Sequence, residues 1–403
     1  MRRFYFPTLT GLMLASGLPN GALGSDCTRT SVSLVPLNEL GTGMYLGQYQ
    51  GGLYLDGLNE PPVDHAMEGR ARAFAIEPLD SSGRPSPSGR YVLLSIGMSN
   101  TTQEFCSAGG AEPCDPWTFM GQSAAHPAVA TVGLKVVNGA LGAQPVANWD
   151  SPTDANYDRV RDQVLTPRGL SEAQVQIVWI KQAIPGPTVS LPSPAANAHS
   201  LMAGLGNLVR SAKIRYPNLR MAFLSSRIYA GYATTALNPE PYAYESAFGV
   251  KWLIESQIMQ MRGGGIDPIA GNLNYATGAA PWLAWGPYLW ADGLTPRDDG
   301  LVWTCADMQS DGTHPSQSGE QKVGELLLQF MLDSPFTRPW FTSCQTTDPD
   351  GDGIVDLNDI PIFVDVLSGT ETEQMRRLGS DRNCDGRVDG TDIAAFAEQL
   401  IGH

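Results

Sequence analysis

The chain has 403 residues, a formal net charge of −15, and charged side chains at 17% of its positions. Because no block of Lys or Arg interrupts this acidic balance, the composition argues against nucleic acid and anionic membrane surfaces as partners. The length allows one large, well-packed domain with a smaller module beside it.

The first 24 residues have the three regions of a secretory signal. A basic start precedes an apolar run over residues 7–18, and Ala22-Leu23-Gly24, with small residues at its first and third positions, follows. The apolar run is too short to cross a bilayer, which takes about 20 residues, and no later segment approaches that length. We therefore expect cleavage after Gly24 and a mature protein outside the cytoplasm, without a membrane anchor.

All six cysteines follow the expected cleavage site, and an even number in an exported protein favours disulfides over free thiols. We expect Cys106 to pair with Cys114, which is close in the chain, while fifteen full connectivities remain open. No two cysteines have the CxxC spacing of a zinc site. The six are Cys27, Cys106, Cys114, Cys305, Cys344 and Cys384.

Asn59, Glu60 and Pro61 match an acid/base signature of some barrel glycosidases, which need a second, facing carboxylate. We interpret this segment as a loop. It lies before the first clear strand, and no eightfold strand-helix repeat follows it.

From about residue 90, short apolar runs alternate with amphipathic helical stretches, which predicts a parallel sheet covered by helices. The 44 glycines and 30 prolines indicate long connecting loops that carry much of the function. This domain is expected to span residues 25–344, followed by a linker at 345–347. Strands are expected at 91–96, 132–137, 175–180 and 221–224, and helices at 198–216, 244–261 and 317–332.

Two short segments carry residue types suited to acyl transfer. Ser99 stands where the first of these strands ends, a position that exposes a side chain at the carboxyl edge of the sheet. Late in the chain, Asp311 precedes His314 by three residues in a turn framed by Gly312 and Pro315. Such an Asp can orient one imidazole nitrogen while the other faces a nucleophile. The pattern predicts a nucleophile, a base and an orienting acid.

The same segments resemble the first and last blocks of the SGNH hydrolase superfamily, in particular its carbohydrate-esterase and sialate O-acetylesterase branches. There the first block reads Gly-Gln-Ser-Asn; here residues 97–100 read Gly-Met-Ser-Asn, and the last block reads DGTHPSQSG. The resemblance implies an α/β fold, a three-layer α/β/α flavodoxin-like sandwich. It further implies that Ser99 is the nucleophile, His314 the general base and Asp311 its orienting acid.

The middle blocks of that family supply an oxyanion hole, whose donors stabilise negative charge on the substrate carbonyl. A Gly-rich turn follows the second expected strand, and the resemblance implies that Gly142 donates its backbone N–H, with Gly139 as the substitute. Where the third block of the family has Asn-Asp or Gln-Gly-Glu, this chain has Lys181-Gln182. The side chain of Gln182 is the candidate second donor.

Two further clusters allow two interpretations each. The aromatic stretch at 281–290 can stack on sugars, because indole faces suit apolar sugar faces, or it can pack in a core or loop. Arg227, Tyr229 and Tyr232 follow an expected strand and either orient a substrate or hold a loop.

The last 56 residues contain one calcium-loop pattern twice, 33 residues apart, and hold 13 acidic but only 4 basic residues. In each copy, oxygen ligands fall at loop positions 1, 3, 5, 9 and 12, with a backbone carbonyl at 7 and a glycine at 6. A disordered acidic terminus would explain the charge but not the glycines or the matched apolar stripes that follow each loop. We expect two calcium ions, on which folding of the tail depends. The expected ligands are Asp348, Asp350, Asp352, Ile354, Asp356, Asp359, Asp381, Asn383, Asp385, Arg387, Asp389 and Asp392, with Ile354 and Arg387 acting through their carbonyls.

Position 12 is Asp in both loops, where ordinary EF-hands have Glu, and the helix before each loop is weak or missing. Both features resemble the dockerin type I module, a tandem of such motifs best known from polysaccharide-degrading assemblies. The resemblance implies a small all-α domain at 348–403, two calcium ions and a cohesin-like protein partner. Positions 10 and 11 are Leu357-Asn358 and Gly390-Thr391 in place of the usual small hydroxyl pair, so the partner stays open.

Two hypotheses for the function follow. The first is a secreted serine esterase that removes acyl groups, foremost acetyl, from a polysaccharide or other glycan through an acyl-enzyme on Ser99. The second is a non-catalytic glycan-binding or scaffold-docked protein that keeps the hydrolase fold. The altered third block motivates it, because removing one oxyanion donor typically lowers the rate by about 100- to 1,000-fold.

Overall fold

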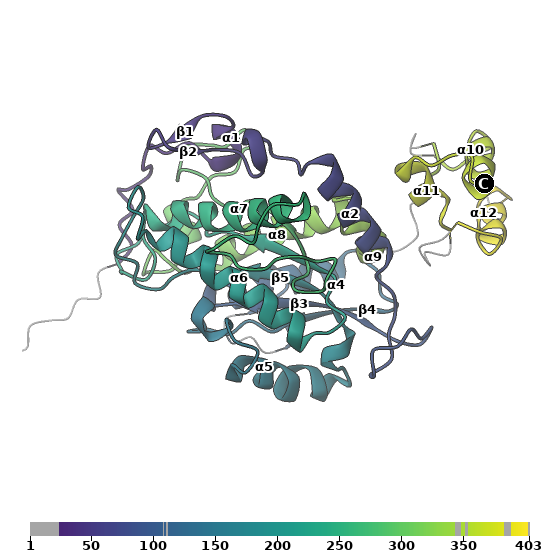
Figure 1. Cartoon of the computed structure of the whole chain (residues 1–403), viewed down its shortest axis with the longest axis horizontal. Helices are drawn as coiled ribbons and strands as arrows, with labels where there is room; N and C mark the ends of the chain where they lie inside the picture. Colours follow the sequence, from purple (N-terminus) through teal and green to yellow (C-terminus); the bar gives the residue numbers. More distant parts are fainter. Residues whose placement is uncertain are drawn as a thin grey trace, which may run out of the picture.

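The computed structural model describes residues 24–107, 109, 112–342, 348–350, 354–382 and 388–401. At its centre is a parallel sheet of five strands in the order β4-β3-β5-β6-β7 (Figure 1). Every residue of β3 and β5 is buried, as expected for strands of a parallel sheet covered on both faces. The strands are β3 (Tyr91–Gly97), β4 (Leu134–Asn138), β5 (Val175–Lys181), β6 (Met221–Ser225) and β7 (Trp282–Trp285).

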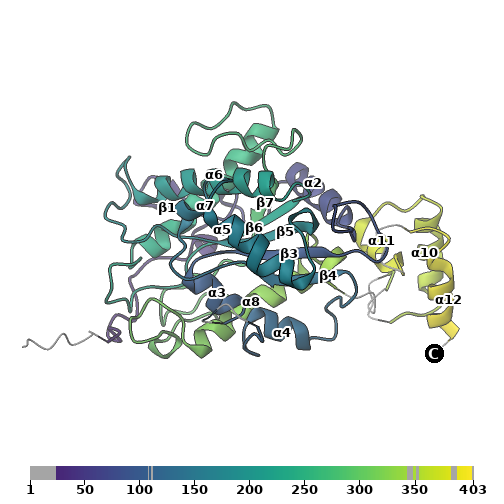
Figure 2. The same cartoon turned by 90° about the horizontal axis from the view of Figure 1, so that it is seen from below.

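Helices cover both faces of this sheet. Figure 2 shows α3, α4 and α8 on one side of the strands and α5, α6 and α7 on the other. On the α3 side, the Phe105 ring stacks on Trp179 of β5, and Phe330 of α8 packs edge-on against Phe223 of β6. The predicted three-layer α/β/α sandwich is therefore confirmed. The helices are α3 (Ser99–Phe105), α4 (Phe119–Ala125), α5 (Ala155–Arg159), α6 (Asn197–Arg215), α7 (Tyr242–Met261) and α8 (Gln317–Asp333).

The elements expected from hydrophobic periodicity agree with the structure to within two residues at each end. One strand of the five-stranded sheet, β7, was not predicted. It has only four residues, all buried, and lies inside the aromatic stretch at 281–290. Trp282, Trp285, Tyr288 and Trp290 are each at most 5% exposed. This stretch is core, which excludes the sugar-stacking interpretation.

The order of the strands defines a switch point at β3. The chain runs from β3 to β4 on one side, and then to β5 on the other side of β3. In open α/β sheets the crevice at the carboxyl ends of the strands beside such a point is the usual ligand site. Ser99 lies there, two residues beyond the end of β3.

The segment before β3 wraps the sheet and is tied to it. Two disulfides are present, Cys27–Cys305 and the predicted Cys106–Cys114. Cys344 and Cys384 lie outside the described residues, as do residues 1–23 of the expected signal.

Glu60 is exposed before α2, so the Asn59-Glu60-Pro61 segment is a loop. The remaining elements of this body are α1 (Leu37–Leu40), β1 (Met44–Tyr45), β2 (Tyr49–Gln50), α2 (Val63–Phe74), α9 (Arg338–Phe341) and short turns of 3₁₀ or π-helix.

The C-terminal tail forms a small helical cluster at one side of the large body (Figure 1). It contains α10 (Asp359–Leu367), α11 (Gln374–Ser380) and α12 (Asp392–Ile401). Phe363 and Phe396, which occupy equivalent positions in the two repeats, stack with their ring centroids 4.1 Å apart. The two apolar helix faces therefore bury against each other, as the repeat predicts.

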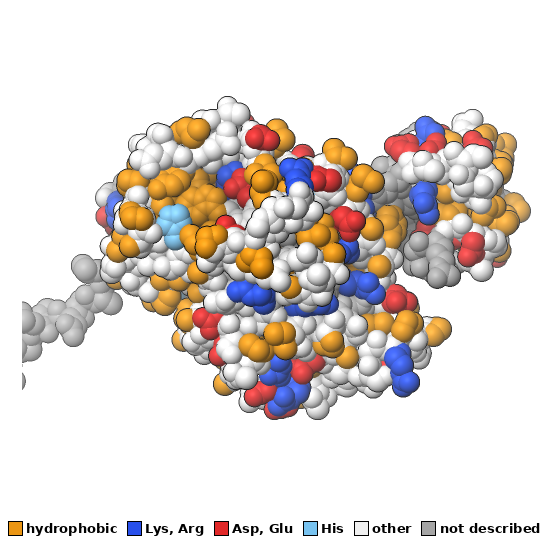
Figure 3. Space-filling model, viewed as in Figure 1, with side chains coloured by type: hydrophobic (Ala, Val, Ile, Leu, Met, Phe, Trp, Pro, Cys, Tyr) orange, Lys and Arg blue, Asp and Glu red, His pale blue; other side chains and the backbone are white. Residues whose placement is uncertain are grey.

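Charged side chains of both signs are scattered over the face drawn in Figure 3. Within the described ranges, every helix is too short or too polar to cross a membrane.

Candidate active site

Ser99 is the first residue of α3, placed there by a sharp exit from β3. Gly97 makes this exit possible, since a Cβ at that position would lie 2.2 Å from the Thr101 hydroxyl and 2.5 Å from the Lys181 carbonyl oxygen. The Thr101 hydroxyl donates to that same carbonyl at 2.7 Å. The start of the nucleophile helix is thus fixed to the end of the neighbouring strand β5.

Asp311 and His314 lie in a tight turn before α8. Gly312 has a φ of +65°, and a Cβ there would lie 2.0 Å from the Tyr232 carbonyl oxygen, so only glycine fits. The turn is closed by the backbone N–H of Gln309, which donates to the His314 carbonyl at 2.8 Å. These contacts explain why the DGTHP segment folds into a rigid turn in front of the helix.

Three side chains from these two segments form a continuous hydrogen-bonded chain. Ser99 Oγ is 2.8 Å from His314 Nε2, and His314 Nδ1 is 2.5 Å from Asp311 Oδ2. His314 and Asp311 are partly exposed, with side-chain exposures of 20% and 27%. The structure therefore brings together all three residues that the sequence pointed to, in the order nucleophile, base and acid.

The Asp311 carboxylate is held ionised. Burial would raise its pKa, but hydrogen bonds from the His314 ring and from the N–H groups of His314 and Thr313 outweigh this effect and lower the pKa to about 2. The two N–H groups donate to Oδ1 at 3.0 and 2.9 Å, while Oδ2 faces the ring. An ionised Asp311 fixes the proton on Nδ1, which leaves the Nε2 lone pair for the serine hydroxyl.

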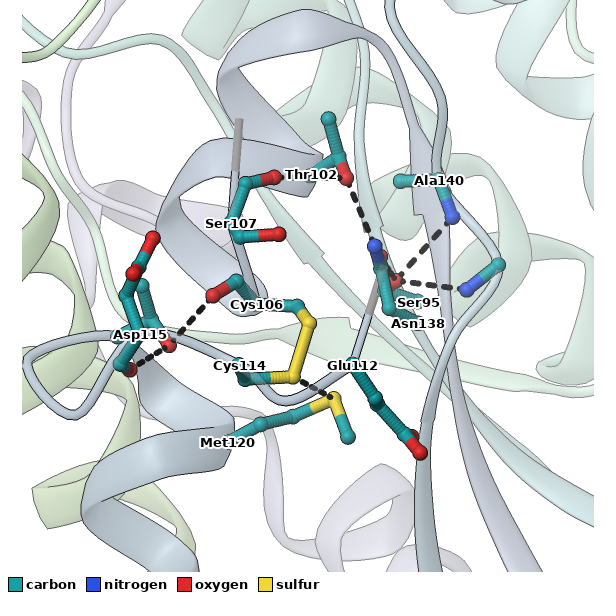
Figure 4. Close-up of a disulfide and its surroundings, with 12 residues drawn as sticks. Ser95, Thr102, Cys106, Ser107, Glu112, Cys114, Asp115, Met120, Asn138 and Ala140 are labelled. Atoms are coloured by element: carbon teal, nitrogen blue, oxygen red, sulfur yellow. Dashed lines mark hydrogen bonds between the residues drawn. A yellow bond between two sulfur atoms is a disulfide. The ribbon is translucent and has the colours of Figure 1, made fainter. Parts of the chain in front are cut away.

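The turn after β4 is shaped by a buried network, shown at the right of Figure 4. Ser95 Oγ donates to Asn138 Oδ1 at 2.6 Å, and Asn138 Nδ2 donates to the Thr102 hydroxyl at 2.7 Å. Ser95 Oγ also accepts the N–H groups of Gly139 and Ala140, at 3.2 and 3.3 Å. The N–H of Gly139 is therefore already used inside the protein.

Gly142 lies against the nucleophile. A Cβ built on Gly142 would be 3.8 Å from Ser99 Cβ, closer than to any other neighbour. Of the two glycines considered as oxyanion donors, Gly142 is therefore the one whose position suits the role.

Gln182 reaches the same turn from the other side of β3. Its side chain is 2% exposed, and Nε2 donates to the Gln144 carbonyl at 3.3 Å. Its Oε1 is buried and has no hydrogen-bond partner among the described residues. The amide thus lies across the carboxyl end of the sheet, anchored to the segment that carries Gly142.

A set of buried charges lies beneath the three residues, and no local sequence pattern indicates it. Lys181 Nζ contacts both carboxylate oxygens of Glu104, at 2.5 and 2.6 Å, and both side chains are fully buried. Burial lowers the pKa of Lys181 and raises that of Glu104. Glu104 is in α3 and Lys181 ends β5, so this ion pair fastens the nucleophile helix to the sheet.

The Arg227, Tyr229 and Tyr232 cluster holds loops. The Tyr229 hydroxyl donates to the Arg29 carbonyl at 2.8 Å, and the Tyr232 hydroxyl donates to the Trp303 carbonyl at 2.7 Å. All three side chains are at most 1% exposed. None of them is placed to touch a substrate.

In the first calcium loop, Asp348, Asp350 and Asp359 each place a carboxylate oxygen within 4.8 Å of the others. Ligands around one Ca²⁺ lie 2.3–2.6 Å from it, so oxygens on opposite sides are about 5 Å apart, and this cluster fits the ion. Asp359 is fully buried, and burial raises the pKa of its carboxyl. A buried carboxylate beside other acids is stabilised by a cation.

In both loops, the aspartate at position 12 accepts two backbone N–H groups, one of them from position 9. Asp359 accepts the N–H groups of Asp350 and Asp356 at 3.0 and 2.8 Å, and Asp392 accepts those of Arg382 and Asp389 at 2.7 and 2.8 Å. Asp381 is also buried there, and Ile354 is exposed in the first loop. The expected ligands Asp352, Asn383, Asp385 and Arg387 lie outside the described residues.

No protein-family model matches the chain. No curated protein matches it either. Solved structures that are similar in part include a family two carbohydrate esterase from Clostridium thermocellum in complex with cellohexaose, with 14% identity, a TM-score of 0.32, and coverage of 62% of this chain and 66% of that one. A Corynascus thermopiles carbohydrate esterase family 2 enzyme with a carbohydrate-binding domain has 14% identity and a TM-score of 0.32, with coverage of 60% of this chain and 66% of that one.

An extracellular lipase from Streptomyces rimosus gives 12% identity, a TM-score of 0.28, and coverage of 59% of this chain and 98% of that one. The chain thus matches just under two thirds of the length of the two carbohydrate esterases. Likenesses of this strength decide nothing about activity.

Proposed function

We propose that the chain is a serine hydrolase that cleaves carboxylic esters through an acyl-enzyme on Ser99. The observation that carries this proposal is the hydrogen-bonded chain of Ser99 Oγ, the His314 ring and Asp311 Oδ2, with distances of 2.8 and 2.5 Å. A serine activated by a base, with the base oriented by a third group, is the general signature of a covalent nucleophile.

The proposed steps follow from these positions. His314 Nε2 takes the hydroxyl proton as Ser99 Oγ attacks the ester carbonyl carbon. The bond from that carbon to the alkoxy oxygen breaks, and His314 delivers the proton to the leaving alcohol. Water, deprotonated by His314, then attacks the acyl-enzyme and releases the acid, with the proton returning to Ser99. Asp311 stabilises the imidazolium during both formation and hydrolysis of the acyl-enzyme because it remains ionised.

An oxyanion forms during both formation and hydrolysis of the acyl-enzyme, and it needs hydrogen-bond donors beside Ser99. Gly142 is the backbone candidate because it lies against Ser99 and its rival Gly139 donates elsewhere. Gln182 is the side-chain candidate because its amide is buried over the same end of the sheet. Each such donor is worth about 100- to 1,000-fold in rate.

For the substrate we propose an acyl ester, foremost an acetyl ester, on a glycan outside the cytoplasm. Support comes from the tail, whose paired loops resemble dockerin modules of polysaccharide-degrading assemblies, and from the two disulfides, which are typical of exported proteins. The signal-like N-terminus agrees with this setting.

We further propose that the tail at 348–403 binds two calcium ions and acts as a docking module for a cohesin-like partner. The convergence of Asp348, Asp350 and Asp359 supports the first ion, and the position-9 N–H bond to Asp392, which repeats the one to Asp359, supports the second. Calcium would supply the positive charge that balances these converging carboxylates in the folded tail. Calorimetric titration of the chelator-treated protein with Ca²⁺ tests this; a stoichiometry of two is expected, and no binding would refute it.

The proposed activity is tested with p-nitrophenyl acetate and acetylated xylan. The wild type should release p-nitrophenol and acetate, Ser99→Ala should not, and Ser81→Ala, an exposed loop serine, is the matched control. Equal rates for the wild type and Ser99→Ala would remove Ser99 from the mechanism. Binding of xylan without any turnover would favour the non-catalytic alternative.

A further inference from the structure

The peptide group that joins Thr313 to His314 is clamped at both ends. Its N–H, which belongs to His314, donates to Asp311 Oδ1 at 3.0 Å. Its carbonyl oxygen, which belongs to Thr313, accepts Asn100 Nδ2 at 3.1 Å and Arg227 Nη2 at 3.2 Å. Because a carbonyl oxygen has two lone pairs, these two donors saturate it.

This clamp bears on the direction of the His314 ring. A peptide unit is planar, so fixing both its N–H and its C=O fixes its orientation. That orientation sets where the Cα–Cβ bond of His314 points, and hence where Nε2 meets Ser99. Asn100 is the residue next to Ser99, so one donor ties the base directly to the nucleophile segment.

Arg227, the other donor, is buried among charged groups. It is 1% exposed, and the carboxylates of Glu104, Glu240 and Asp311 all stabilise its charge. Glu104 in turn binds Lys181 beneath α3. The buried charges therefore link the helix that begins at Ser99 to the turn that carries His314, through the end of β5 and the loop after β6.

We propose that Arg227 is a positioning residue, which sets the Thr313–His314 peptide and thereby aims the base at Ser99. Its burial keeps it away from any substrate, so it acts only through His314. This inference rests on the proposed serine hydrolase function and extends it, since it identifies which buried group aligns the base.

The test compares Arg227→Lys with the wild type. Lysine keeps the positive charge that the buried carboxylates need, but it lacks the planar fork that reaches the Thr313 carbonyl. Arg297→Lys is the matched control, because Arg297 is also buried and also donates to backbone carbonyls, those of Tyr288 and Trp290, away from the three reacting residues.

Two quantities are measured, and each is normalised to the amount of folded protein. The first is kcat and KM for p-nitrophenyl acetate, with active sites counted by a fluorophosphonate probe. A small misplacement of a catalytic group costs up to about 100-fold, so kcat per active site should fall by about 10- to 100-fold in Arg227→Lys with little change in KM. The rate of fluorophosphonate labelling should fall by the same factor, while Arg297→Lys matches the wild type.

The second readout does not depend on turnover. It is the low-field NMR signal of the His314 Nδ1 proton, assigned by its absence in His314→Ala. The signal should be present in the wild type and in Arg297→Lys, and weakened or lost in Arg227→Lys. An unchanged signal together with an unchanged kcat per site would overturn the inference, as would an equal loss in Arg297→Lys. An inactive wild type would refute the proposed function alone, and the NMR comparison would still decide the role of Arg227.

Discussion

The Ser95 hydroxyl accepts the backbone N–H of Gly139 at 3.2 Å, from within the strand β3. This bond joins the strand that leads to the nucleophile with the turn that carries Gly142. Because the Gly139 N–H is used in this bond, Gly142 is the better candidate for an oxyanion donor. The buried side chain of one strand thus occupies one N–H of the next loop, which supports the proposal of Gly142 as the backbone donor.

Replacing Ser95 should therefore destabilise the protein. Ser95→Ala removes the acceptor of two buried N–H groups and the donor to Asn138, and each buried polar group left unsatisfied costs about 1–3 kcal/mol. We expect a loss of about 2–4 kcal/mol in the free energy of unfolding, measured by urea denaturation. Ser123→Ala is the control, because the Ser123 hydroxyl is buried without a partner in the described part of the chain. Equal stability of Ser95→Ala and Ser123→Ala would show that the network is dispensable.

Asp311→Asn should leave the fold intact and lower kcat by about 10,000-fold, the effect known for this change in serine proteases. An asparagine amide presents N–H where the carboxylate accepted one, so the imidazole proton moves to Nε2 and the base is lost. Steady-state hydrolysis of p-nitrophenyl acetate measures the change, with the exposed Asp333→Asn as control. A variant that kept the wild-type kcat would exclude Asp311 from the mechanism.

The seven helices and strands expected from the sequence were found because each has an apolar run or an amphipathic pattern of its own. The strand β7 was missed because its short, Trp-rich sequence suits a binding cleft as well as a core. Ser99, Asp311 and His314 were found because each lies in a short segment with its own local pattern.

The residues that support the site could not be found in this way. Glu104 and Lys181 are 77 positions apart, and Arg227 and Thr313 are 86 apart. Each pair forms only when the fold brings two segments together. A buried ion pair has no local period, so Lys181 was considered only as a departure in the third block and Glu104 was not considered.

Glu320 makes stability depend on pH. This carboxyl is 6% exposed, and burial raises its pKa to about 7 from the ordinary 4.5, although the Trp117 indole N–H donates to it. The folded state therefore binds the proton more tightly than the unfolded state does. The stabilisation that this group provides is complete below pH 4.5 and is lost as the pH rises to about 7.

Glu320→Gln mimics the protonated form and should remove this dependence. In thermal melts, the Tm of the variant relative to the wild type should increase between pH 4.5 and 7 and stay constant above pH 7. Glu325→Gln, at an exposed position of the same helix, is the control. A constant difference between Glu320→Gln and the wild type over this range would contradict the shifted pKa.

Chelation should unfold the tail and spare the large body. Calcium at about 100 times its Kd stabilises a folded site by about 2.7 kcal/mol, and this is lost with EDTA. We expect two calorimetric transitions in calcium and only that of the α/β body in EDTA. A single cooperative melt, lost entirely on adding EDTA, would contradict this separation.

Asp359→Asn should weaken calcium binding at the first loop, because one charge leaves a set of three converging carboxylates. Titration calorimetry should show one tight site in place of two. Glu398→Gln, exposed on α12 and outside both loops, serves as the control and should keep two.

Peptide mapping after treatment with a fluorophosphonate tests whether Ser99 is an activated nucleophile. We expect a single modified residue, Ser99, in the wild type, and no modification in Ser99→Ala or His314→Ala. An unmodified wild type, or a label on another residue with Ser99 intact, would contradict it.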